Sequence, residues 1–142
     1  MTTLEQSLYA FLIADAGLTP ILGAGDDARV YPKRLPQEPT LPALVYQMVS
    51  SVPNYTTDQA GDPPSATAFV KERVQFDLWA AIYEDLLPLK SALFAGISGF
   101  RGTMDTMKIE SAFVVNEVDL FEPDTGYSRK VVDVIFSFEE QP

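Results

Sequence analysis

The side chains that could perform chemistry in this chain are almost all carboxylates. Two adjacent pairs, Asp26-Asp27 and Glu139-Glu140, could in principle exchange protons or hold Mg²⁺. Neighbouring residues on a strand point to opposite faces, and the second pair lies close to the last residue of the sequence. Neither pair therefore favours a catalytic site.

The absence of His and Cys excludes several kinds of site. A Ser-His-Asp or Cys-His arrangement cannot form from these residues, and neither can a metal site built on imidazole or thiolate. The segment Gly23-Ala24-Gly25 has the glycine spacing of a phosphate-binding loop, but no strand is expected before it and Asp26 and Asp27 would repel phosphate. We interpret it as a surface turn, and we expect no catalytic residue, cofactor or metal.

The charge balance is acidic, with 20 Asp and Glu against 10 Lys and Arg and a net charge of −10. Such a chain repels a phosphate backbone, and it has no basic run. The acidity either serves solubility or forms a surface that DNA or an acidic partner passes without binding. A mimic of DNA would need carboxylates gathered on one face, whereas here they are scattered. No apolar run approaches the ~20 residues of a membrane span, and the first residues do not resemble a signal peptide, so we expect no membrane partner.

Two helices are predicted from apolar residues at helical spacing. The first covers residues 3–16 and ends at Gly17, and it begins with one of two capping boxes, Thr2 with Glu5 or Thr3 with Gln6. A short helical turn follows over residues 18–23, with Thr19 as cap and Pro20 in the first turn. The second helix has Asp85 as cap, Pro88 in its first turn, and Gly96 and Gly99 at its end. Its apolar stripe is Ile82, Leu86, Leu89 and Leu93.

Alternating apolar residues predict the strands. Strands are expected over residues 43–50, 69–80, 108–121 and 127–138, with a short extended piece at 29–32 and loops at 52–68 and 99–106. The last two strands form a hairpin whose turn contains Pro123, Asp124 and Gly126. The order of elements predicts an α+β fold, a single domain over residues 1–142 with a mainly antiparallel sheet and two helices packed on one face. The irregular segment at about 52–68 is either disordered or an arm that reaches a neighbouring subunit.

Three segments resemble the tail completion, or tail terminator, family of long-tailed bacteriophages, which is also found in gene transfer agents. A first helix similar to that of the family precedes them. The first segment is Arg29-Val30-Tyr31-Pro32, which leads to Leu41-Pro42-Ala43-Leu44-Val45-Tyr46-Gln47. The second is Val74-Gln75-Phe76-Asp77-Leu78-Trp79-Ala80, and the third is the hairpin from Asp119 to Asp133. Their order and spacing carry the resemblance over most of the chain. Residues 52–68 do not match the family pattern.

The resemblance implies a structural virion protein rather than an enzyme. Proteins of this family form a homo-oligomeric ring, commonly a hexamer, at the head-proximal end of the tail tube. The ring stops tube polymerisation and offers a surface to the head–tail connector. The implied partners are further copies of the chain, the tube protein and the connector protein, with DNA only passing through the lumen and assembly in the cytoplasm of the bacterial host.

Candidate interface residues come from one strand and from the last hairpin. Along residues 69–80, the side chains that alternate with the apolar ones form a solvated row or a row that faces another subunit, with Trp79 either under a helix or between subunits. The hairpin tip is the second candidate contact with a neighbouring subunit or the tube. The full set is Arg73, Gln75, Asp77, Trp79, Phe121, Glu122, Asp124, Tyr127 and Arg129.

Two other functions are also compatible with the sequence. One is another head–tail connector or adaptor protein, which would share the size and acidity of a tail terminator. The other is an acidic regulatory protein that mimics DNA and binds a basic partner with a steep salt dependence.

Overall fold

The computed structural model of the chain describes residues 3–54 and 69–139. Its helices are α1 (Leu4–Ala14), α2 (Thr19–Leu22) and α3 (Leu86–Ile97), with single 3₁₀ turns η1 (Gly25–Asp27) and η3 (Tyr83–Asp85). Its strands are β1 (Val30–Pro32), β2 (Ala43–Asn54), β3 (Phe69–Ala80), β4 (Gly102–Met104), β5 (Met107–Ile109), β6 (Ser111–Phe121) and β7 (Ser128–Glu139).

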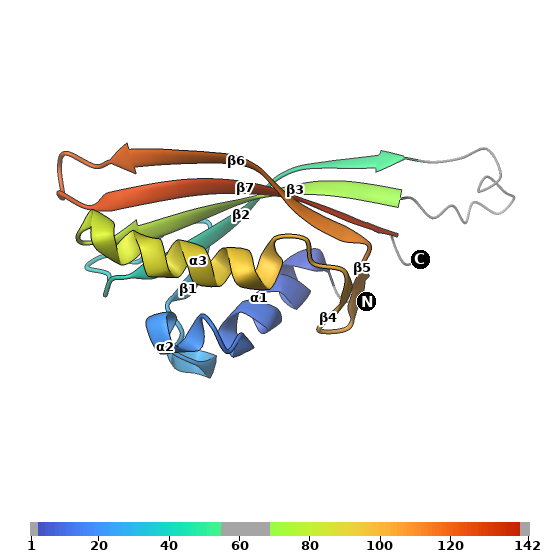
Figure 1. Cartoon of the computed structure of the whole chain (residues 1–142), viewed down its shortest axis with the longest axis horizontal. Helices are drawn as coiled ribbons and strands as arrows, with labels where there is room; N and C mark the ends of the chain where they lie inside the picture. The colour runs from blue at the N-terminus through green and yellow to red at the C-terminus, as the bar shows by residue number, and fades with distance from the viewer. Residues whose placement is uncertain (1–2, 55–68, 140–142) are drawn as a thin grey trace, which may run out of the picture.

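The main sheet has five strands in the order β1-β2-β3-β7-β6. Only the short edge strand β1 runs parallel to its neighbour β2, and the other pairs are antiparallel. The helices lie on one side of this sheet, while β4 and β5 form a small second sheet beside α1 (Figure 1). The predicted α+β class with a mainly antiparallel sheet and helices on one face is confirmed.

The core lies between the helices and one face of the sheet. Leu8 and Leu12 of α1 and Leu89 and Leu93 of α3 are fully buried against strand residues on that face. Burying each such side chain stabilises the fold by roughly 1.5–3 kcal/mol. The alternating apolar residues of β3 and β7 are all buried in this core, and they are Val74, Phe76, Leu78, Ala80, Val132, Val134, Phe136 and Phe138.

Side-chain caps set the limits of α1. Of the two possible capping boxes, the structure forms the one in which Thr3 Oγ1 accepts from the Gln6 amide at 3.2 Å and Gln6 Oε1 accepts from the Thr3 amide at 3.0 Å. The helix ends at Ala14, before the predicted Gly17. Asp15 ends it instead, because Asp15 Oδ1 accepts from the amides of Gly17 at 2.8 Å and Leu18 at 3.2 Å.

The predicted cap of α2 is wrong, whereas Asp85 does occupy the predicted cap position of α3. Leu18, not Thr19, precedes α2, and neither Leu18 nor Asp85 makes a side-chain cap hydrogen bond. Pro20 and Pro88 do lie in first turns, where a missing amide costs nothing.

The apolar stripe of α3 also differs from the prediction at both ends. Ile82 lies before the helix and is exposed, so the buried stripe begins at Leu86. Gly96 falls inside the helix, which continues to Ile97. Gly99, with φ of +76°, follows the end of the helix as predicted.

Three strand limits differ from the prediction. β2 extends to Asn54, so residues 52–54 of the predicted loop are strand and the rest of that loop lies outside the described residues. The predicted loop at 99–106 contains β4, and the predicted strand at 108–121 is divided into β5 and β6. The division falls at Glu110, because β5 pairs with β4 in the small sheet whereas β6 pairs with β7 in the main sheet.

Two β-bulges interrupt the pairing of the long strands that lie outside the central pair. One lies in β2 between Met48 and Ser50, and the other in β6 between Val114 and Asn116. Met48 is opposite Val74 on β3, and Val114 is opposite Val134 on β7. Since Val74 and Val134 also pair with each other, the two bulges lie on one line across the sheet.

The turn between β6 and β7 forms as expected, with one change. Gly126 has a φ of +77°, and its amide donates to the Glu122 carbonyl oxygen at 2.8 Å. The side-chain bond of the turn comes from Thr125 rather than Asp124, because Thr125 Oγ1 accepts from the Tyr127 amide at 3.2 Å.

Gly96 is required by close packing between α3 and the end of α1. A Cβ at this position would lie 2.7 Å from Asp15 Oδ2, and Asp15 is held by its two hydrogen bonds to the backbone. We expect Gly96→Ala to lower the free energy of unfolding by about 1–2 kcal/mol, because crowding outweighs the gain in helix propensity. Urea unfolding would measure it. Ser91→Ala, on the exposed side of α3, is the control and should not destabilise; an equally stable Gly96→Ala protein would contradict the close contact.

Candidate functional site: the sheet face without helices

The predicted polar row of β3 lies on the face of the sheet opposite the helices, which we call the open face. Arg73, Gln75, Asp77 and Trp79 alternate with the buried core residues and are partly exposed. The strand register places two residues of β7 beside them, with Gln75 opposite Asp133 and Trp79 opposite Arg129. The open face therefore brings together the β3 candidates and one candidate from the last hairpin.

Ion pairs join β3 to β7 across the open face. Arg73 Nη2 lies 2.7 Å from Asp133 Oδ2, and Arg129 Nη2 lies 2.9 Å from Asp77 Oδ2. Gln75 Nε2 donates to the other Asp77 oxygen at 3.1 Å. Each carboxylate of this row is thus matched by an arginine, which makes the middle of the open face nearly neutral in an acidic chain.

Arg129 connects this row to the hairpin tip. Its guanidinium lies 5.1 Å from the ring of Trp79, in cation–π contact, and its Nη1 lies 3.3 Å from Glu122 Oε1. Trp79 therefore lies on the open face with Arg129 against it, and the alternative that a helix covers it is wrong.

Several buried polar atoms of the open face lack a partner among the described residues. They are Trp79 Nε1, Arg129 Nε and Asp133 Oδ1, and only 7% of Asp133 is exposed. A buried polar group without a hydrogen bond costs about 1–3 kcal/mol. Two donors and one acceptor of this face are thus left without a hydrogen bond within the described residues.

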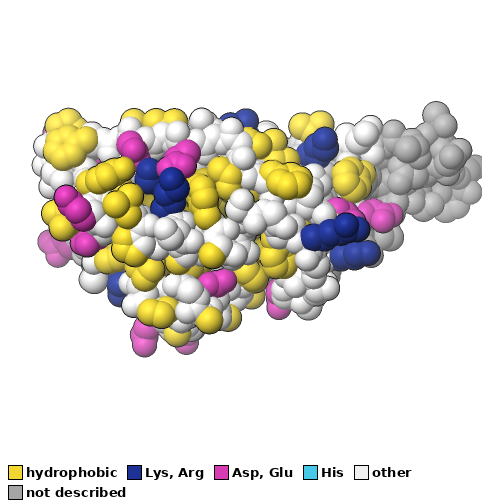
Figure 2. Space-filling view, in the orientation of Figure 1, with side chains coloured by type: hydrophobic (Ala, Val, Ile, Leu, Met, Phe, Trp, Pro, Cys, Tyr) yellow, Lys and Arg dark blue, Asp and Glu magenta, His cyan; other side chains and the backbone are white. Residues whose placement is uncertain are grey.

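Exposed apolar side chains surround the ion pairs. Phe113, Val118 and Leu120 of β6 lie on the open face, at the edge of the sheet, and all are exposed. Figure 2 shows hydrophobic side chains along the upper margin of the molecule, where Figure 1 places β6. An exposed edge strand with apolar side chains is a typical surface for association with another chain.

The hairpin tip holds the remaining predicted residues. Phe121 is 64% exposed, Asp124 is exposed, and Tyr127 and Glu122 are partly buried. By register Phe121 belongs to the helix side of the sheet, opposite Ser128, and not to the open face. The tip and the open face are therefore two neighbouring surfaces that share Arg129.

A charged cluster on the helix side was not expected from the sequence. Lys130 is almost fully buried and binds Glu117, at 2.8 Å, and Asp119 of β6. Lys90 of α3 also lies 2.7 Å from Glu117. Burial lowers the pKa of Lys130, but its hydrogen bonds to the two carboxylates outweigh burial and raise it. The bonds from Lys130 and Lys90 in turn lower the pKa of Glu117.

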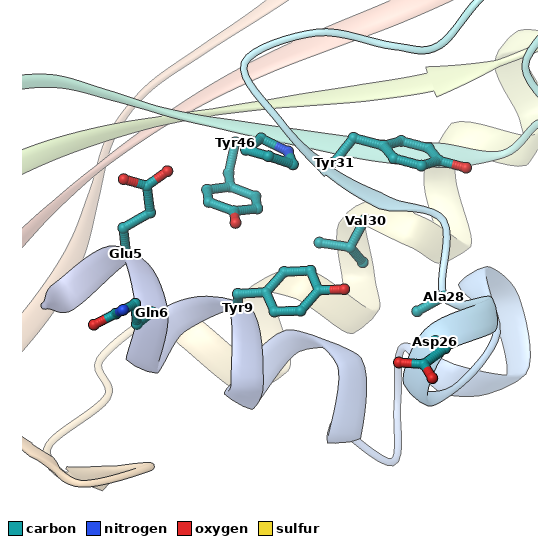
Figure 3. Close-up of a pocket in the computed structure, with 9 residues that line it drawn as sticks. Glu5, Gln6, Tyr9, Asp26, Ala28, Val30, Tyr31 and Tyr46 are labelled. Atoms are coloured by element: carbon teal, nitrogen blue, oxygen red, sulfur yellow. The ribbon is translucent and has the colours of Figure 1, made fainter. Parts of the chain in front are cut away.

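A groove between α1, β1 and β2 is the second candidate surface, which we call the tyrosine groove. Its volume is about 580 Å³, and Tyr9, Tyr31 and Tyr46 line it (Figure 3). The rings of Tyr9 and Tyr46 lie 6.4 Å apart, with Glu5 and Asp26 at the margins. Burial, followed by the negative charge of Glu5 and the neighbouring Tyr9, raises the pKa of Tyr46 to about 12.

The carboxylate pairs do not form a recognisable catalytic or metal centre in the described part of the chain. Asp26 and Asp27 are exposed in η1, and Glu140 lies outside the described residues. Residues 3–54 and 69–139 contain no group of three or more acidic side chains placed to hold a metal ion. Within the same ranges no helix is long and apolar enough to cross a membrane.

Comparison with known proteins identifies the family. The family model described as Tail completion protein gp17 matches residues 6–139, and the chain therefore belongs to this family of phage tail proteins. It is accordingly a structural protein of the virion tail. No curated protein matches the chain.

A solved structure shows the same fold. A chain from the structure titled "Virion of native gene transfer agent (GTA) particle" superposes with a TM-score of 0.68 at 15% sequence identity. The match covers 96% of this chain and 95% of that chain. At this identity the likeness establishes the fold alone.

The Lys130 cluster predicts a pH dependence of stability. Because the pKa of Glu117 is lowered from its ordinary 4.5, its ion pairs stabilise the folded state above that pH, and this contribution is lost as the pH falls through the folded pKa. We expect Glu117→Gln to lower the melting temperature at pH 7. At acid pH, where Glu117 is protonated, the variant and the wild-type protein should melt at nearly the same temperature. Glu84→Gln, at an exposed site, is the control. If the melting temperatures of Glu117→Gln and the wild-type protein differed by the same amount at every pH, the ion pairs of Glu117 would not explain the difference.

Proposed function

We propose that the protein forms a closed homo-oligomeric ring, a hexamer, at the head-proximal end of the tail tube. The ring stops polymerisation of the tube and provides the surface to which the head–tail connector binds. The observation that carries the proposal is the family match over residues 6–139, which covers nearly the whole described chain.

The surfaces of the chain suit this role. A closed cyclic ring needs two different patches on each subunit, one that meets the neighbour on each side. The open face, where the apolar side chains of the edge strand β6 lie beside the ion pairs, is one such patch, and the tyrosine groove is a separate one. Stopping a polymer requires binding groups rather than catalytic ones, which agrees with a site built from arginine, carboxylate and aromatic side chains.

Termination itself requires an asymmetry along the ring axis. One rim must bind the last ring of tube subunits, and the other must not accept a further tube ring. We assign one of these axial contacts to the exposed hairpin tip, which leaves the open face for the neighbouring subunit of the ring. DNA passes through the lumen, and an acidic lining would let it pass with little binding; a lumen lined by basic residues would contradict this part of the proposal.

Deletion of the gene tests the proposal directly. Electron microscopy of lysates from the parent phage or element should show overlong or abnormally ended tails that are not attached to filled heads. Tails of normal length beside filled heads would instead identify a connector or adaptor that acts after termination. Normal infectious particles would exclude both roles and favour an acidic regulatory protein.

The open face predicts a separation between folding and assembly. Val118 is 41% exposed on this face and does not belong to the core, so Val118→Asp should change the free energy of unfolding by no more than about 0.5 kcal/mol. The same substitution should weaken subunit association by more than about tenfold, because it places a charge in an apolar contact. Light scattering and thermal melts at low and high protein concentration would measure the two effects.

The matched control is Ile82→Asp, at a position that is 53% exposed beside α3. It adds the same charge outside the strands of the sheet and should leave association unchanged. If both variants weakened association equally, the added charge alone would explain the loss, and the open face would not be the contact.

A further inference from the structure

We propose that the end of the molecule at the β6–β7 turn binds the last ring of tube subunits, through a surface of the tube protein that carries Lys or Arg around apolar side chains. The inference rests on the proposed function, since it takes the hairpin tip as an axial contact of the ring. It adds a second segment and the chemistry of the partner. We call this surface the tip end, and it is formed by Phe121 and Asp124 of the hairpin and by Ile82, Tyr83, Glu84 and Asp85 between β3 and α3.

Strand pairing brings the two segments of the tip end together. Ser128, the first residue of β7, lies opposite Ala80, the last residue of β3, and opposite Phe121, the last residue of β6. The ring of Tyr83 lies 5.9 Å from Lys130 Nζ, on the helix side of the sheet to which Phe121 also belongs. Figure 1 shows the β6–β7 turn and the start of α3 at the same end of the molecule, on the left. The two segments therefore form one surface.

Exposed apolar side chains give the tip end the capacity to bind another protein. Phe121 is the most exposed large apolar side chain among the described residues, and Ile82 and Tyr83 are exposed as well. None of the three belongs to the core. Figure 2 shows hydrophobic and acidic side chains together at the left margin of the molecule. A protein partner that covered these apolar groups would remove them from water, which favours binding.

The carboxylates of the tip end determine the charge of the partner. Glu84, Asp85 and Asp124 are exposed, and none forms an ion pair with residues of the described ranges. Arg129 and Lys130, the basic residues of this hairpin, already bind two carboxylates each. The tip end therefore carries negative charge that the fold does not neutralise, and Lys or Arg on the partner supplies the opposite charge.

Charge and function select the tube rather than a second copy of the chain. A second copy would present the same acidic end, and this chain has no basic run to complement it. In the proposed ring the open face meets the neighbouring subunit, which leaves the tip end for a partner along the axis. The tube is that partner because the ring must recognise the tube end in order to stop polymerisation.

Sedimentation with isolated tails tests the inference. Tails and filled heads are separated from lysates of the gene deletion, and each is mixed with the purified chain at low and at high salt. The wild-type chain should sediment with the tails, and its apparent Kd should rise steeply with salt, because salt screens a contact between opposite charges. Sedimentation with the filled heads alone would overturn the tube as the partner.

Removal of charge tests the acidic part of the tip end. The double variant Glu84→Gln with Asp124→Asn should raise the apparent Kd for tails by about tenfold and make it less dependent on salt. The matched control, Asp27→Asn with Asp105→Asn, removes two exposed carboxylates elsewhere and should bind as the wild-type chain does. Asn tolerates the positive φ of Asp105, so the control should fold. Equal losses in the two double variants would overturn the assignment of the charge to the tip end.

Phe121→Ser tests the apolar part. Since Phe121 does not belong to the core, the variant should keep the melting temperature of the wild-type chain while its apparent Kd for tails rises by more than about tenfold. The control is Val52→Ser, at a similarly exposed apolar residue near the other end of the sheet, and it should leave binding unchanged. Thermal melts check that both variants are folded.

The outcomes separate this inference from the proposed function. If tails bound the wild-type chain, the charge variant and Phe121→Ser equally well, the tip end would not be the contact, and the terminator role would remain intact. If the wild-type chain sedimented with neither tails nor heads, the proposed function itself would be overturned.

Discussion

The antiparallel pairing of β3 with β7 is the constraint on which the rest of the structure depends. Twelve residues of β3 pair without interruption with twelve of β7, and both strands are central in the sheet. This register sends Phe76 and Val132 into the core and, by alternation, places Asp77 and Arg129 on the opposite face. A shift of one residue would bury the ion pairs under the helices and expose the core, so the hydrophobic pattern fixes the open face as well.

Much of this fold could be predicted from the sequence because its signals are local. The alternation in β3 and the capping box at Thr3 involve residues close together along the chain, and both are confirmed. The failures involve distant contacts. Gly96 does not end α3 but lies inside it, where close packing against Asp15 leaves no room for a Cβ, and Lys130 is buried with Glu117 and Asp119 on the neighbouring strand. The β3 row and Arg129 were predicted, but Asp133 and the tyrosine groove depend on tertiary pairing that sequence spacing does not reveal.

The open face and the tyrosine groove differ in their electrostatics. On the open face Arg73 and Arg129 match the carboxylates one to one, so that an acidic chain has a nearly neutral area suited to close contact. The tyrosine groove, in contrast, keeps Glu5 and Asp26 without ion pairs among the described residues. The open face and the tyrosine groove therefore differ in local charge within one acidic chain.

The two aligned bulges, at Met48–Ser50 and Val114–Asn116, have a consequence for growth of the sheet itself. A bulge bends a strand and increases its twist, and here the bend runs along one line through Val74 and Val134. The outer edge of β6 is thereby divided into two short straight halves, and no incoming strand can pair along its whole length. The backbone itself therefore disfavours the addition of strand after strand at this edge to form an endless fibre, whatever side chains lie on the edge.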